Sequence, residues 1–354
     1  MNIHEKYIKR CIELAKNGMG NTYPNPLVGS VIIVNNTIIG EGWHRKAGMP
    51  HAEVNAINAV KDKSQLKKAT LYVNLEPCSH YGKTPPCSEL IINTGIKNVV
   101  IGTIDPNVNV SGNGIKKMMA AGCNVTVGIL QDECNGLNKR FFTYHKQKRP
   151  YIILKWAQSA DNFISPSNNK TGKPVWISNQ YSRQLVHKWR SEEQAILVGT
   201  NTITVDNPKL TTRAWHGNNP IRVIIDRTLK TYSNYNVWDD STETICITDI
   251  KHRGKLPLSI DKTQTLVEFI NFSEDIIEQI AAVLYRLEIQ SIIIEGGAKT
   301  IQAFIDSALW DEARIFKSTI NLKLGIKAPE ISGKIITQGT IANDTLKIIR
   351  NNDR

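Results

Sequence analysis

Cysteine is scarce in this sequence, and long uninterrupted runs of apolar residues are missing. Only six of the 354 residues are cysteine, too few for the disulfide framework that stabilises small secreted proteins. No run of about 18 apolar residues occurs, so the sequence predicts no transmembrane helix. The N-terminal residues alternate charged and apolar side chains at helical spacing and lack the continuous apolar segment of a signal peptide, so we expect a cytoplasmic protein.

The charge balance is positive but has no marked pattern. Lysines and arginines outnumber aspartates and glutamates by 44 to 32, which gives a formal charge of +12. Such a chain suits anionic ligands, including phosphorylated small molecules, better than cationic ones. The basic residues are dispersed and do not alternate with aromatic residues in a stripe, so we expect no nucleic-acid partner.

The length and the order of predicted elements indicate two α/β domains. In the first we expect helices over 3–18, 51–60, 87–93 and 114–121, with strands over 28–34, 37–43, 70–75, 98–104 and 124–130. Asn35 and Asn36 tolerate positive φ and predict a tight hairpin between the first two strands. In the second we expect strands over 151–157, 194–199, 221–226, 243–248 and 291–294, with helices over 179–190, 273–287 and 299–309. The polar stretch 146–150 lies between the two patterns, so we predict domains over 1–147 and 148–354.

One imidazole, two thiols and a nearby carboxylate form the most informative pattern. His51 follows Pro50 and is expected at the start of a helix, which places Glu53 in the first turn. Cys78 follows a predicted strand, and Cys87 opens another predicted helix. The imidazole and the two thiols can therefore converge on one tetrahedral zinc ion whose fourth position stays open for water. Glu53 would remain free to move protons, as in hydrolytic zinc enzymes such as deaminases.

Each of these residues also has a less specific interpretation. A single histidine two residues before a glutamate is common, and the two cysteines could be packing residues or part of a closed structural zinc site. Eight residues separate the cysteines, more than in the usual deaminase signature. The remaining cysteines are expected to be reduced packing residues; they are Cys11, Cys123, Cys134 and Cys246.

Longer strings of residues connect the chain to a known family. The string Glu76-Pro-Cys-Ser-His-Tyr-Gly-Lys-Thr-Pro-Pro-Cys87, with Pro24-Asn-Pro-Leu-Val-Gly29 and Pro50-His-Ala-Glu-Val54, closely resembles the bifunctional deaminase–reductases of bacterial riboflavin biosynthesis. Later segments fit the same family in order, namely Leu154-Lys155, Ser159-Ala-Asp161, Trp176-Ile-Ser178, Val205-Asp-Asn-Pro-Lys-Leu210 and Ile294-Glu-Gly-Gly297. The resemblance implies an N-terminal cytidine-deaminase-like three-layer α/β/α domain and a C-terminal dihydrofolate-reductase-like α/β domain.

The resemblance also implies two reactions and two cofactors. The first reaction is the zinc-dependent hydrolytic deamination of 2,5-diamino-6-(5-phosphoribosylamino)pyrimidin-4(3H)-one. The second is the NADPH-dependent reduction of the ribosyl side chain of 5-amino-6-(5-phosphoribosylamino)uracil to a ribityl side chain. A phosphorylated substrate and a phosphorylated cofactor both agree with the positive charge of the chain. A homo-oligomer is the state that the family leads us to expect.

In the first domain, the resemblance implies a zinc-ligand set, a proton shuttle and a substrate pocket. These are His51, Cys78 and Cys87 for Zn2+, Glu53 for proton transfer, and Asn25, His44, His80 and Lys83 for the substrate. The amide of Asn25 and the imidazole of His44 can bind the polar edge of a pyrimidine. The open alternatives are turn capping for Asn25 and a solvated loop for His80 and Lys83.

The second domain lacks the GxGxxG fingerprint, and its nearest counterpart is Glu295-Gly296-Gly297 between a predicted strand and a predicted helix. Glycines there let the backbone approach a phosphate, and the helix start supplies free N–H groups. The resemblance assigns Gln158, Trp176, Thr202, Asp206, Gly296 and Gly297 to the cofactor, and Lys155, Pro174, Arg190, Leu210, Arg213 and Glu295 to the substrate. Arg190 and Arg213 are candidate phosphate clamps, with surface ion pairing as the alternative.

Two positions depart from the family pattern. Relatives usually carry Ser-Leu-Asp-Gly where this chain has Ser159-Ala-Asp-Asn162. Asparagine tolerates positive φ, so we expect the turn at Asn162 to be kept. Pro174 occupies a position at which relatives often have a hydroxyl residue. No general acid is evident for the hydride step, so this reduction would depend mainly on the positioning of cofactor and substrate.

Three other functions account for parts of the pattern. A nucleic-acid deaminase would share the zinc site, but the wide cysteine spacing and the second α/β region argue against it. A structural zinc module joined to a binding domain would not need a free Glu53. A deaminase with a degenerate reductase domain would differ only in lacking NADPH-dependent turnover.

Overall fold

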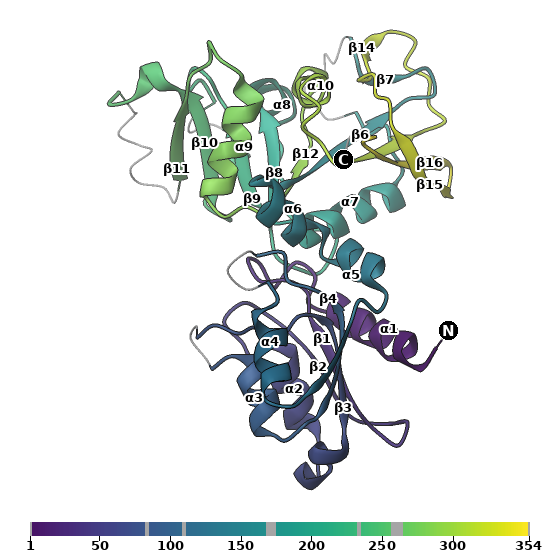
Figure 1. Cartoon of the computed structure of the whole chain (residues 1–354). Helices are drawn as coiled ribbons and strands as arrows, with labels where there is room; N and C mark the ends of the chain where they lie inside the picture. Colours follow the sequence, from purple (N-terminus) through teal and green to yellow (C-terminus); the bar gives the residue numbers. More distant parts are fainter. Residues whose placement is uncertain are drawn as a thin grey trace. The chain divides into compact units, whose positions relative to one another are not determined.

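The computed structural model describes residues 2–81, 85–107, 111–167, 175–231, 235–255 and 265–352. The chain divides into two units, Met1–Lys148 and Arg149–Arg354, drawn in Figure 1. The first unit ends with helix α6 (Lys139–Gln147), which stops because Lys148 takes up a left-handed conformation. From the sequence we predict this boundary one residue earlier, between 147 and 148.

The N-terminal unit is built on a five-stranded sheet in the order β2-β1-β3-β4-β5. Its strands are β1 (Gly29–Val34), β2 (Thr37–Trp43), β3 (Thr70–Leu75), β4 (Asn98–Thr103) and β5 (Asn124–Val127). Strand β1 is antiparallel to β2 and β3, whereas β3, β4 and β5 run parallel. The predicted hairpin is confirmed, because Asn35 and Asn36 join β1 to β2 with φ values of 47° and 62°.

Helices cover both faces of this sheet (Figure 1). The covering helices are α1 (Ile3–Lys16), α2 (Ala52–Ala59), α3 (Cys87–Asn93), α4 (Asn113–Ala120) and α5 (Gln131–Leu137). A short 3-10 helix, η1 (Lys63–Lys68), lies between α2 and β3 in the chain. Helices α2, α3 and α4 share a core with Ile32, whereas α1 and α5 share a second core with Val31. Neighbouring residues of β1 thus point to opposite faces. The predicted three-layer α/β/α arrangement is confirmed.

The C-terminal unit contains a nine-stranded sheet in the order β11-β10-β9-β8-β12-β6-β13-β16-β15. Its strands are β6 (Tyr151–Gln158), β8 (Ala195–Gly199), β9 (Ile221–Ile225), β10 (Thr244–Asp249), β11 (Thr265–Ile270), β12 (Ser291–Ile294), β13 (Glu312–Lys317), β15 (Lys334–Ile341) and β16 (Asp344–Arg350). Neighbouring strands from β11 to β13 are parallel, and β16 is antiparallel to both β13 and β15. A separate pair joins β7 (Phe163–Pro166) to β14 (Gly325–Lys327).

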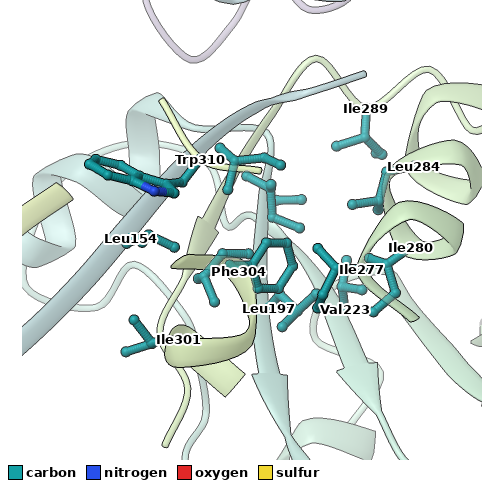
Figure 2. Packing of buried hydrophobic residues seen from close by; sticks show 14 of the residues in the cluster. Leu154, Leu197, Val223, Ile277, Ile280, Leu284, Ile289, Ile301, Phe304 and Trp310 are labelled. Carbon is teal, nitrogen blue, oxygen red and sulfur yellow. The ribbon is translucent and has the colours of Figure 1, made fainter. Parts of the chain in front are cut away.

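Helices also cover both faces of the large sheet. They are α7 (Gln180–Glu192), α8 (Thr200–Asp206), α9 (Ile276–Arg286) and α10 (Ala298–Asp306), with short 3-10 helices η2 (Asn236–Trp238) and η3 (Ile250–His252). Figure 2 shows the core beneath α9 and α10, where Ile280 and Phe304 approach Leu197 and Val223 of the central strands. Helices α7 and α8 pack against the opposite face. In the described part of the chain, no helix combines the length and apolar character needed to cross a membrane.

A buried ion pair fixes the start of the C-terminal unit. The guanidinium of Arg149 donates from Nη1 to Asp311 Oδ2 at 2.6 Å and from Nη2 to Oδ1 at 2.7 Å. Both side chains are about 5% exposed, and the same carboxylate accepts from the backbone N–H of Ile152 on β6. The bidentate ion pair satisfies both buried charges. It joins Arg149, the first residue of this unit, to Asp311 and through it to strand β6.

Candidate metal centre and candidate reductase site

Three loop and helix-end residues of the N-terminal unit meet at one point. His51 is the N-cap of α2, Cys87 is the first residue of α3, and Cys78 lies in the loop that follows β3. Their ligand atoms all lie within 4.8 Å of one another. His51 Nδ1 is 3.6 Å from Cys78 Sγ and 3.4 Å from Cys87 Sγ. Tetrahedral zinc with Zn–N of about 2.0–2.1 Å and Zn–S of about 2.3 Å requires N···S distances of about 3.5 Å, so these residues fit the ion.

The carboxyl group of Glu53 lies buried beside this cluster. Glu53 is the second residue of α2 and is only 3% exposed. Burial, together with the charge of Cys78, raises the pKa of Glu53 to about 7. A carboxyl group with such a pKa can both accept and release a proton near neutral pH. Among the described residues, the metal cluster itself contains only the imidazole and the two thiols.

Two predicted pocket residues lie next to the metal ligands. The ring of His44 packs edge-on against that of His51, with 5.3 Å between their centroids. His44 Nδ1 lies 3.2 Å from the carbonyl of Pro50, and Nε2 lies 3.0 Å from Asn25 Nδ2. Burial lowers the pKa of His44, so the neutral ring donates from Nδ1 and accepts from Asn25 through Nε2. This arrangement leaves Asn25 Oδ1 as an acceptor for an amino group.

The loop after Cys78 is described only in part. His80 is exposed and lies in this loop, two residues past the thiol ligand. Lys83 lies outside the described residues. Asp105, which we did not predict, faces the same region: burial raises its pKa to about 6, Glu76 adds to this rise, and His80 opposes it. The acidic residue after β4 gives no sequence signal of its own, because its position depends on packing between strands distant in the chain.

Two cations predicted to contact the reductase substrate, Lys155 and Arg190, pair with the carboxylate of a third predicted residue, Glu295. Glu295, directly after β12, accepts from Arg190 Nη2 at 2.7 Å and from Nε at 3.2 Å. Lys155 Nζ on β6 lies 3.6 Å from the same carboxylate. All three side chains are 10–15% exposed. Burial acts to raise the pKa of Glu295, but Arg190 and Lys155 outweigh it and lower this pKa to about 2.

The same cluster includes further residues. Burial and the nearby Arg190 lower the pKa of Arg213, so two guanidinium groups face one region, as a phosphate clamp would require. His187, which we did not predict, is 6% exposed, and burial with both arginines lowers its pKa to about 4. Its spacing of three residues before Arg190 on α7 was the available signal. Leu210 is 2% exposed and its side chain belongs to the core, so only its backbone can reach a ligand.

Three of the predicted cofactor residues, Thr202, Gly296 and Gly297, lie near two helix starts that follow neighbouring parallel strands. Strand β8 leads into α8 through Gly199, and β12 leads into α10 through Gly296 and Gly297. Neither N-cap glycine provides a side-chain cap, so N–H groups of both helices remain available. The turns pack closely: a Cβ atom on Gly199 would lie 2.8 Å from Thr300 Oγ1. Such a cradle at the carboxyl ends of parallel strands fits a dinucleotide diphosphate.

The other cofactor-side predictions are more scattered. Thr202 and Asp206 both belong to α8, and a Cβ atom on Gly297 would lie 3.6 Å from Thr202 Oγ1. Burial raises the pKa of Asp206. Trp176 is 55% exposed and stacks on a guanidinium group, with Arg183 Cζ 4.7 Å from the ring centroid. Pro174, predicted on the substrate side, lies outside the described residues.

The unusual turn after β6 keeps the expected conformation. Asn162 has a φ of 64°, which confirms that asparagine here adopts the left-handed conformation. Its Oδ1 accepts from Gln158 Nε2 at 2.9 Å and from Lys317 Nζ at 3.0 Å. The substituted side chain therefore holds the amide of Gln158, a predicted cofactor residue.

Replacing Glu295 by glutamine should destabilise the C-terminal unit at neutral pH. The change leaves Lys155 and Arg190 buried without their counter-charge, at a cost of about 3–5 kcal/mol in unfolding free energy. The folded-state pKa of about 2 lies below the ordinary value of 4.5. The carboxylate therefore stabilises the fold above pH 4.5, and its contribution is lost as the pH falls toward 2. Urea unfolding at several pH values measures the difference between the two proteins.

The matched control is Glu268→Gln, because Glu268 pairs with the 60% exposed Arg286 in the same unit. The Glu268 side chain is 13% exposed, but its replacement leaves only a solvated cation unpaired, which should cost less than about 1 kcal/mol. Equal unfolding free energies for wild type and Glu295→Gln at pH 7 would contradict the stabilising role of the buried carboxylate.

Comparison with known families divides the chain in the same way. Residues 1–103 match the cytidine and deoxycytidylate deaminase zinc-binding region. Residues 150–322 match the RibD C-terminal domain. The two matches confirm the fold class predicted for each part of the chain.

Relatives match nearly the whole chain. The riboflavin biosynthesis protein RibD of Aquifex aeolicus is 39% identical over 341 residues, which cover 96% of this chain and 90% of that protein. The RibD protein of Bacillus amyloliquefaciens is 38% identical, with 94% and 89% covered. The crystal structure of a diaminohydroxyphosphoribosylaminopyrimidine deaminase/5-amino-6-(5-phosphoribosylamino)uracil reductase from Thermotoga maritima superposes with a TM-score of 0.88 at 36% identity, covering 99% of both chains. The chain therefore belongs to the RibD family of riboflavin biosynthesis proteins, bifunctional enzymes that combine a zinc-dependent deaminase with an NADPH-dependent reductase.

Proposed function

We propose that the N-terminal unit removes an amino group from 2,5-diamino-6-(5-phosphoribosylamino)pyrimidin-4(3H)-one by hydrolysis. We further propose that the C-terminal unit reduces the ribosyl side chain of the product, 5-amino-6-(5-phosphoribosylamino)uracil, to a ribityl side chain with NADPH. The Thermotoga maritima relative is named for these two activities. The observation that carries the proposal is the cluster of one imidazole and two thiols, with the buried Glu53 carboxyl group beside it.

In the deaminase, each residue has a distinct task. His51, Cys78 and Cys87 hold the zinc ion, which when bound supplies the Lewis acidity that makes water a stronger acid. Glu53 accepts a proton from the attacking water and delivers it to the departing amino group, which leaves as ammonia. Asn25 Oδ1, oriented by the hydrogen bond between Asn25 Nδ2 and His44, binds an amino group of the pyrimidine. We assign the ribose phosphate to His80 of the loop after Cys78 and to Lys83, which lies outside the described residues.

In the reductase, cations bind the substrate and glycine turns bind the cofactor. NADPH, when bound, supplies the hydride. We assign the cofactor to six residues, Gln158, Trp176, Thr202, Asp206, Gly296 and Gly297. We assign the substrate to another six, Lys155, Pro174, Arg190, Leu210, Arg213 and Glu295. Arg190 and Arg213 bind the phosphate, while Glu295 fixes the orientation of Arg190 through two hydrogen bonds.

One incubation tests both halves of the proposal. The purified chain is mixed with the diaminopyrimidinone phosphate, with and without NADPH, and both products are followed by mass. Without NADPH, the deaminated product should accumulate together with ammonia; with NADPH, it should gain two hydrogens. A chain that deaminates but never reduces would have a degenerate reductase, and a chain that does neither would contradict the whole proposal.

Replacing Arg190 by lysine should weaken substrate binding in the reductase alone. Lysine keeps the positive charge but lacks the two parallel N–H donors of the guanidinium. The loss should weaken substrate binding by about 1.5–3 kcal/mol and so raise KM for the deaminated substrate about 10- to 150-fold. Steady-state NADPH oxidation measures KM, and the deaminase rate should not change. Arg286→Lys is the matched control, since Arg286 is 60% exposed and pairs with Glu268. An unchanged KM for Arg190→Lys would remove this residue from the phosphate site.

We also propose that the chain forms a homo-oligomer. Strand β15 is the edge strand of the nine-stranded sheet, and it carries the exposed apolar residues Ile335 and Ile336, which are 50% and 38% exposed. An exposed apolar edge strand favours pairing with another chain. Sedimentation should give a multiple of the chain mass, and Ile335→Lys should lower it. A wild-type monomer at micromolar concentration would contradict the proposal.

The cysteines support a cytoplasmic location. None of the six forms a disulfide, and Cys11, Cys87, Cys123, Cys134 and Cys246 are buried. Free thiols persist in a reducing compartment. We therefore propose that the enzyme works in the cytoplasm.

A further inference from the structure

A buried carboxylate of the metal loop binds the start of a distant helix. Glu76, two residues before Cys78, is 4% exposed. Its Oε1 accepts from the backbone N–H of Gly114 at 3.0 Å and of Ile115 at 3.4 Å. The N-cap of α4, Gly112, has no side chain with which to satisfy these first N–H groups. Glu76 therefore caps α4 from another part of the chain.

The other oxygen of this carboxylate joins both ends of the connection between β4 and α4. Oε2 accepts from the N–H of Gly112 at 2.9 Å and of Asp105 at 3.3 Å. The backbone N–H of Glu76 itself donates to the carbonyl of Thr103, the last residue of β4, at 2.9 Å. Glu76, which directly precedes Pro77 and Cys78, is thus hydrogen-bonded to the end of strand β4 and to the start of helix α4 at the same time.

Two further contacts attach α4 to the metal loop. Lys117 Nζ on α4 donates to the carbonyl of Ser79, the residue after Cys78, at 2.8 Å. The same ammonium lies 3.7 Å from Glu89 on α3, the helix that begins with Cys87. At the helix start, a Cβ atom on Gly114 would lie 2.2 Å from the carbonyl oxygen of Pro77. Helix α4 therefore contacts the loop on both sides of its thiol ligand.

We propose that Glu76 and Lys117 are positioning residues of the metal centre, which hold Cys78 where the ion requires it by fixing its loop to α4. This inference rests on the proposed zinc site. The loop follows the end of β3, and its described residues, 76–81 and 85–86, form no helix or strand that could fix the thiol. Without these contacts the loop would have to be ordered when the metal binds, and that ordering opposes binding. Residues that support metal ligands in this way typically change metal affinity by about 10- to 100-fold.

The test measures zinc affinity of the full chain by competition with a chromogenic chelator. Glu76→Gln should weaken zinc binding about 10- to 100-fold, because an amide NH2 replaces one acceptor oxygen opposite backbone N–H groups. Lys117→Met should weaken it in the same direction by a smaller factor; its side chain is 45% exposed, so this variant should fold even where Glu76→Gln does not. Lys116→Met is the matched control, an exposed lysine on the same helix.

A second control separates positioning from stability. Ile8→Ala opens a cavity in the same unit under α1, away from the metal loop, and should leave zinc affinity near wild type. Wild-type affinity in Glu76→Gln and Lys117→Met would overturn the inference, and so would an equal loss of affinity in Ile8→Ala. If the wild-type chain itself bound no zinc, the proposed function would be wrong, and this inference with it.

Discussion

Glu53→Gln is expected to keep one zinc ion per chain and to lose deamination. Glutamine has nearly the same shape as glutamate but cannot take a proton from water at neutral pH. Positioned acid–base groups contribute about 100- to 10,000-fold to a rate, so the release of ammonia should fall by a factor in this range. Zinc content should not change, because Glu53 lies outside the ligand cluster.

The measurement is ammonia release by zinc-loaded protein, with zinc content determined on the same sample. Reduction of substrate supplied in its deaminated form is an internal control and should proceed at the wild-type rate. Glu13→Gln, an exposed glutamate on α1, is the matched substitution and should leave both activities unchanged. Deamination near the wild-type rate in Glu53→Gln would disprove the proton-transfer role.

Cys87→Ser is expected to lose zinc and, with it, deamination. A serine hydroxyl remains protonated at neutral pH and is a poor zinc ligand, whereas a thiol ionises readily when it binds the metal. The Cys87 side chain is 1% exposed and its Sγ lies 3.4 Å from His51 Nδ1. Bulk water therefore has little access to the position of the sulfur and should not replace it as a metal ligand. Zinc content after dialysis should fall from one ion per chain to a small fraction of that.

Cys123→Ser is the control for this change. Cys123 is 6% exposed in the same unit and donates to the carbonyl of Ile96, so it belongs to the core. Its replacement should leave zinc content unchanged even if it lowers stability. A Cys87→Ser protein with wild-type zinc content would remove Cys87 from the ligand set.

Elements with a regular apolar pattern could be predicted from the sequence, and irregular ones could not. The hairpin at Asn35 and Asn36 follows from local backbone preferences, which depend on no distant contact. Strand β15 was not predicted, because nearly all its residues are exposed and show no alternation of apolar and polar side chains. Strand β13 was not predicted either, since its buried residues include Glu312 and Arg314, which pair with each other at 2.7 Å.

In the candidate site, too, residues placed by local sequence could be predicted, and residues whose role depends on distant contacts could not. His51, Glu53, Cys78 and Cys87 could be named because a helix start, a strand end and a local motif bring each to a position that nearby residues fix. The role of Glu76 could not be predicted, because the partners of its carboxylate begin 29 residues further along the chain and are backbone groups without a sequence signal. Contacts of this kind become visible only once the packing of α4 against the metal loop is known.

The most direct test of the central claim is a crystal structure of the zinc-loaded chain. We predict one ion in the N-terminal unit, bound by His51 Nδ1 and by the sulfurs of Cys78 and Cys87, with a water molecule as fourth ligand and Glu53 unligated within hydrogen-bond distance of that water. An ion enclosed by four protein side chains, or bound elsewhere in the unit, would contradict the account.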